Sequence, residues 1–163
     1  MNVSMIKRRE LGVSAVVVIL CLPVLLAGTA ATLDAGNLLL MRYRLQAAAD
    51  LAALAGVQSV DWDELALGQL VLDESEALQR ARYHAEVNIE SMMNRSPERV
   101  DVWVVNASED DPAAHPLTGG VLVHPTVVVA CEVRGPDSWF NSWQEAPVLR
   151  VEADGSLRTR RDD

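Results

Sequence analysis

The uncharged stretch from Leu11 to Leu33 constrains this chain more than any other feature of its sequence. It follows three consecutive basic residues, Lys7 to Arg9, and it ends at Asp34. As a helix rising about 1.5 Å per residue, the stretch would be about 34 Å long, slightly more than the ~30 Å hydrocarbon core of a bilayer. Because a charge inside that core is costly, we predict a transmembrane helix over residues 11–33, preceded by a basic cytoplasmic N-terminus over residues 1–10. The positive-inside rule then places the rest of the chain outside the cytoplasm.

A cleaved signal peptide is the alternative to this anchor, because small residues precede Ala31 (Gly28, Thr29 and Ala30), as signal peptidases require. Two features favour the uncleaved anchor. The uncharged run exceeds the usual signal-peptide length of about 7 to 15 apolar residues, and the helical pattern continues past Ala31. Pro23 lies near the middle of the run, where we expect a bend in the helix and not its end.

Beyond Asp34 the sequence becomes amphipathic. Apolar residues recur there at spacings of three and four: Leu38, Met41, Leu45, Ala48, Ala52 and Ala55. This seam predicts an amphipathic stalk helix over residues 34–56 that continues the membrane helix, with Gly56 as its stop signal. Two packing partners remain open for the seam, the protein's own domain and a neighbouring subunit.

Residues 57–154 are long enough for one small extracytoplasmic domain, and their patterns predict an α+β fold. One helix is predicted after a cap at Asp73 or Ser75, and it ends before Pro97. Its expected inner face comprises Leu78, Ala81, Ala85, Ile89 and Met92. A further short helix or turn is expected within residues 61–72.

Alternating and apolar runs predict an antiparallel sheet of about three strands in the same domain. The predicted strands cover residues 100–105, 126–133 and 148–153, and the middle one is expected to be central because it is apolar on both faces. Residues 155–163 are predicted to form a loose charged tail.

The charge and the ionisable residues argue against several functions. The net charge is −9, or about −11 beyond the basic first ten residues, which disfavours nucleic acid and anionic lipid as partners of that part. His84, His115 and His124 have no Cys or acidic partner at metal-ligand spacing, so we expect surface histidines and no metal or other cofactor. No catalytic constellation is present in the sequence, which predicts a protein that is not an enzyme.

The two cysteines and one aromatic cluster each allow more than one interpretation. Cys21 and Cys131 are not expected to pair with each other, and Cys131 is either a small buried residue or an intermolecular crosslink. Trp139, Phe140 and Trp143 either cover the sheet as core or form an exposed patch for a partner or the membrane interface.

The run Asp34-Ala35-Gly36 and the segment from Arg44 to Gly56 (RLQAAADLAALAG), set directly behind a basic-flanked anchor, resemble the N-terminal region of TadE/TadG-like proteins. These proteins are associated with assembly of the Flp (tight adherence) pilus. The resemblance covers residues 8–56. Two departures are visible, because Ala47 stands where the family usually has Asn and Leu51 stands where a small residue is common.

The resemblance implies a single-pass protein of the bacterial inner membrane, with other pilus or secretion-machine membrane proteins as partners and helix-mediated homo- or hetero-oligomers. It implies the short, minor-pilin-like form, since the chain has no Asp-x-Ser-x-Ser motif of a von Willebrand A domain. Prepilin processing is not expected, because the fifth position after Gly12 holds Val17 and not the Glu that pilin-like peptidases favour.

The expected interaction motif comprises Asp34, Gly36, Leu45, Gln46, Ala48, Asp50, Ala52 and Leu54. Asp34 would mark the outer membrane interface and Gly36 would permit close approach of another helix. Gln46 and Asp50 have the i,i+4 spacing of a hydrogen-bonded pair. The rival function is a secreted or anchored binding module that uses Trp139 and Trp143.

Overall fold

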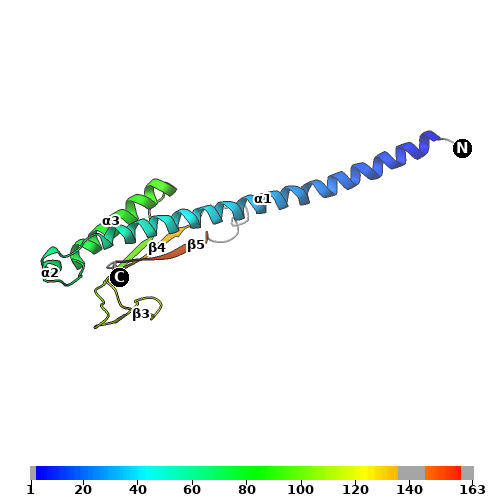
Figure 1. The fold of residues 1–163 in the computed structure, drawn as a ribbon. Coiled ribbons are helices and arrows are strands. Elements are labelled where there is room, and N and C mark those ends of the chain that lie inside the picture. Colours follow the sequence, from blue (N-terminus) through cyan, green and yellow to red (C-terminus); the bar gives the residue numbers. More distant parts are fainter. Residues whose placement is uncertain (1–2, 136–145, 159–163) are drawn as a thin grey trace.

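A single long helix and a small domain at one of its ends make up this protein (Figure 1). The structure, a computed structural model, describes residues 3–135 and 146–158, with side chains from Ala15 onward. Helix α1 (Val3–Val57) is long and apolar enough to cross a membrane, with a mean hydropathy of 2.5 in its most apolar part, none of which is buried within the protein. The predicted fold class, an apolar N-terminal helix followed by a small α+β domain, is confirmed.

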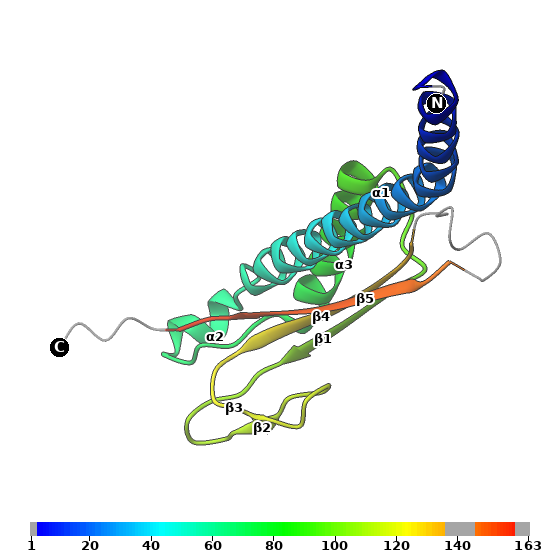
Figure 2. The same cartoon turned by 90° about the vertical axis from the view of Figure 1, so that its right-hand side faces the viewer.

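Helix α1 joins the predicted anchor and stalk without a break. It continues through Pro23, as expected. Figure 2 shows that its blue N-terminal part runs in a different direction from the rest. The hydroxyl groups of Thr29 and Thr32 donate to the backbone oxygens of Leu25 and Gly28, at 2.7 and 2.8 Å. These polar groups are therefore satisfied within the helix and do not interrupt its apolar character.

Two further helices follow, α2 (Trp62–Ala66) and α3 (Glu74–Met93). Asp73 caps α3 by accepting a hydrogen bond from the backbone N–H of Glu76, and this bond lowers the pKa of the Asp73 carboxyl. The helix ends before Pro97, as predicted, and Asn94 closes its last turn in a left-handed conformation (φ 51°).

The inner face of α3 differs from the prediction at its first position. The buried residues are Ala77, Ala81, Ala85 and Ile89, whereas Leu78 is 38% exposed and Met92 is partly buried. The helix therefore presents mainly alanine to α1, which keeps the two helix axes close.

Three antiparallel strands form the sheet in the order β1 (Arg99–Val105), β4 (Thr126–Arg134) and β5 (Val148–Ser156). Strand β4 is central, as predicted, and nearly all of it is buried. A separate hairpin pairs β2 (Ala113–Ala114) with β3 (Val121–Leu122).

The prediction of a loose tail from residue 155 is wrong for Gly155 and Ser156, which belong to β5. A Cβ on Gly155 would lie 2.9 Å from the backbone oxygen of Ala53 and 2.9 Å from Cγ2 of Val57. This part of β5 therefore packs directly against α1.

The core lies between the sheet and the two long helices, which cover one face of it (Figure 2). Cys131 is buried in that core, in agreement with its interpretation as a small buried residue. Neither Cys21 nor Cys131 forms a disulfide. Burial raises the pKa of the Cys131 thiol to about 11, so the thiol is neutral at physiological pH.

Candidate functional site: the two faces of the stalk helix

The predicted interaction motif divides between two opposite faces of α1. Leu45, Ala48 and Ala52 are fully buried in the core of the same chain. The seam therefore packs on the protein's own domain. Ala49 and Ala53 are fully buried as well, although the predicted seam, with its spacings of three and four residues, did not include them. A wider apolar stripe, as is typical of helices on globular domains, would have found them.

Close packing of small residues determines how α1 contacts the rest of the domain. Gly56 was predicted to stop the helix, but α1 continues to Val57 and Gly56 is buried. A Cβ at this position would lie 3.0 Å from both Cβ of Ala81 and Cγ1 of Val127. Gly56 thus permits α1, α3 and β4 to meet at one point.

Gln46 joins α1 to the edge strand of the sheet. Its side-chain nitrogen donates to Asp50 Oδ1 at 3.0 Å, which confirms the predicted i,i+4 pair. The same nitrogen donates to the backbone oxygen of Glu152 in β5 at 2.9 Å. Both N–H groups of the amide are used, so this motif residue orients the stalk relative to the sheet.

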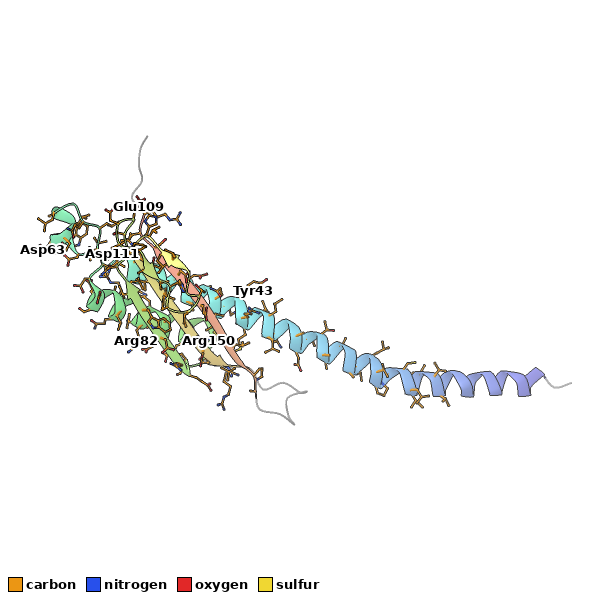
Figure 3. The ribbon with its side chains drawn as sticks, turned by 90° about the horizontal axis from the view of Figure 1, so that it is seen from below. Tyr43, Asp63, Arg82, Glu109, Asp111 and Arg150 are labelled. Carbon is orange, nitrogen blue, oxygen red and sulfur yellow. The ribbon has the colours of Figure 1, made fainter. Side chains whose placement is uncertain are left out.

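The opposite face of α1 is exposed in the part of the chain that the structure describes. Leu54 lies nine residues from Leu45, half a turn away on a helix, and is 55% exposed. Gly36 also lies nine residues from Leu45, and no heavy atom comes within 4 Å of a Cβ built on it. Tyr43 extends from this part of α1 and is 66% exposed (Figure 3). We call this exposed face the outer stripe; it comprises Leu33, Gly36, Leu40, Tyr43, Ala47, Leu51 and Leu54.

Asp34 lies at the end of the apolar run and is half-buried. Its Oδ2 atom is hidden from solvent and has no hydrogen-bond partner among the described residues. Carboxylates at such a position in a membrane-spanning helix commonly have a functional partner.

His115 contradicts the prediction of surface histidines, because it is buried. Its Nδ1 accepts hydrogen bonds from the backbone N–H groups of Leu117 and Thr118 at 3.2 and 3.1 Å. Its Nε2 lies 3.4 Å from Asp154 Oδ1 in β5. His115 therefore holds the β2–β3 hairpin to the sheet. Among the described residues, no group of three His, Cys, Asp or Glu side chains could hold a metal ion.

Trp139, Phe140 and Trp143 lie outside the described residues. Both interpretations of this aromatic cluster remain predictions.

Residues 12–59 match the family described as "Putative Flp pilus-assembly TadE/G-like". No significant match was found among curated proteins or among solved structures. The matched segment contains most of α1, including both the outer stripe and the buried seam.

Proposed function

We propose, from the match of residues 12–59 to the TadE/TadG-like family, that this chain has a specific role in Flp/Tad pilus or related secretion-machine assembly. It is a non-enzymatic, single-pass component of the bacterial inner membrane that acts as a minor-pilin-like scaffold. Its N-terminus lies in the cytoplasm, which the basic residues Lys7 to Arg9 support, and its small domain lies outside.

One observation carries this proposal: the described residues of the domain cover only one face of the stalk, and the outer stripe is exposed. The spacing of the outer stripe continues towards the N-terminus through Thr29, Leu26, Leu22 and Ile19, all of which are exposed on α1. One partner helix that crosses the membrane and continues beyond it would cover this whole face. Other pilin-like or secretion-machine subunits of the membrane fit that description.

Both departures from the family pattern, Ala47 and Leu51, lie on the outer stripe, and both are exposed. Neither residue contributes to the core of this chain.

The test replaces Leu40 and Leu54 together by Ala in the full chain expressed in its own cell. Membrane complexes captured by crosslinking, and assembled pili, should fall about tenfold or more, because truncation of central apolar side chains removes most of the packing between helices. The circular dichroism spectrum of the purified chain should not change, since both side chains are more than half exposed.

Leu78→Ala is the matched control, because Leu78 is also an exposed leucine but lies on α3. It should leave the complexes intact. Normal complexes and normal pili in the Leu40 and Leu54 double variant would contradict the proposed role of the stalk. Replacing Ala48 or Ala52 by Leu is not a test of partner binding, because both residues lie in the core of the domain.

A further inference from the structure

The end of the molecule farthest from the N-terminus of α1 carries a rigid loop, residues 61–71, which includes α2 (Figure 1). An isolated β-bridge between Val60 and Leu72 closes the base of this loop. The side chain of Asn106 accepts a hydrogen bond from the backbone N–H of Leu72 at 2.9 Å and donates one to its carbonyl oxygen at 3.0 Å. Asp61 also caps α2 by accepting from the N–H groups of Asp63 and Glu64. The backbone of the loop is therefore well held.

This rigid loop presents large apolar side chains to solvent. Trp62 is 74% exposed, Leu67 is 77% exposed and Leu65 is 36% exposed. Tryptophan buries a large area on contact, and it is enriched at the centres of protein interfaces. Apolar side chains held in place on an ordered backbone lose little conformational entropy on binding.

A groove of about 760 Å³ lies beside the loop. Its walls are formed by residues 68–71 of the loop and by residues 106–111, which follow β1. Residues 123–125 and Arg158 complete the lining. The groove is open to solvent, and its size suits a short segment of an extended chain.

The surroundings of the groove are strongly acidic. Residues 58–76 and 105–125 contain no Lys or Arg, and their nine carboxylates are Asp61, Asp63, Glu64, Asp73, Glu74, Glu76, Glu109, Asp110 and Asp111. Figure 3 shows Asp63, Glu109 and Asp111 gathered at the same end of the molecule. Among the described residues that line the groove, Arg158 is the one Lys or Arg side chain. Such a surface repels nucleic acid and anionic lipid and attracts cationic protein segments.

We propose that this distal tip, formed by Trp62, Leu67 and the acidic groove, is a docking site for a partner protein segment that combines Lys or Arg with apolar side chains. The apolar side chains of the segment pack on Trp62 and Leu67, and its cations pair with the carboxylates of the groove. The site is separate from the outer stripe, so a scaffold bound along α1 can hold a second partner at its far end.

The test uses the full chain in nanodiscs of zwitterionic phosphatidylcholine and a fluorescent seven-residue peptide of alternating Leu and Lys as the probe. Anisotropy should show saturable binding above that of empty nanodiscs. Alternating Leu–Glu and Gly–Lys peptides should bind at least about tenfold more weakly, because each lacks one of the two features that the site recognises. Raising the salt concentration should weaken binding of the Leu–Lys peptide, since its cations pair with partly exposed carboxylates.

Two matched pairs of variants separate recognition at the tip from general charge attraction. Trp62→Ala should weaken binding about tenfold or more, whereas Tyr83→Ala, at an aromatic residue 61% exposed on α3, should not. Glu109→Gln with Asp111→Asn should weaken binding, whereas Glu86→Gln on α3 should not. Trp62 and Glu109 are exposed, so their variants are expected to fold, which circular dichroism checks. Absence of saturable binding, or equal affinities for the Trp62 and Tyr83 variants, would overturn the proposal.

Discussion

The side-chain amide of Gln46 links the stalk helix to the edge strand of the sheet by a hydrogen bond. Replacing Gln46 by Ala removes the bonds to Asp50 and to the backbone oxygen of Glu152, both near the surface of the domain. We predict a loss of about 1 kcal/mol in the free energy of unfolding, the usual net contribution of such bonds. Thermal unfolding of the detergent-solubilised chain measures this loss. Gln79→Ala, on the exposed face of α3, is the control and should be neutral. Equal unfolding midpoints for the two variants would show that the hydrogen bonds of Gln46 do not stabilise the domain.

Cys131 makes the stability of the domain depend on pH in the alkaline range. Its pKa rises from 9.0 to about 11 on folding because burial disfavours the thiolate. The folded state therefore binds more protons than the unfolded state between these values. This contribution is fully present below pH 9 and is lost as the pH rises towards 11. Denaturant unfolding at several pH values should show that the Cys131→Ala variant loses less free energy of unfolding over this interval than the unmodified protein. Equal losses in the two proteins would contradict the role of Cys131.

At the scale of secondary-structure elements, the close approach of α1 to α3 and β4 depends on Gly56. Gly56→Ala should destabilise the domain by about 1 to 3 kcal/mol through overpacking, even though alanine favours the helix. Gly36→Ala is the matched substitution in the same helix, and it meets open space. It should be neutral or stabilise the helix by up to about 1 kcal/mol. Thermal unfolding measures the difference in stability between the two variants. Similar midpoints would show that the contact of α1 with α3 and β4 adapts to an added methyl group.

The elements themselves could be predicted because their signals are local. The helical period, the capping Asp73 and the apolar run of β4 all lie within the segments that they describe, and the structure confirms each of them. The hairpin of β2 and β3 was missed, because its strands are two residues long and its packing depends on His115. That histidine was assigned to the surface because Asp154, its neighbour in space, is distant along the chain.

For the whole molecule, the continuity of α1 bears on the question of cleavage. The helix passes Ala31 without a break, and among its side chains from Ala15 onward the buried ones begin at Met41. A product that starts near Ala31 would therefore keep the core, so folding of the domain cannot distinguish an anchor from a signal peptide. Cell fractionation combined with intact-mass measurement of the chain can distinguish them.

We expect a full-length chain that requires detergent for extraction from the membrane. The reason is that the exposed apolar surface of α1 before Asp34 is compatible with lipid and not with water. A soluble product that begins near Ala31 would contradict the anchor and would favour the secreted binding module.

The sequence by itself determined the apolar helix, its continuation into a stalk and the α+β class of the domain, because hydropathy and periodicity depend only on neighbours along the chain. Only the tertiary structure decided which face of the stalk is covered, since both faces are apolar and alanine occurs on both, at Ala47 and Ala48. It also assigned Gln46 a contact 106 residues away and Gly56 a role in packing. These assignments depend on where α3 and β5 lie in space, which no local pattern encodes.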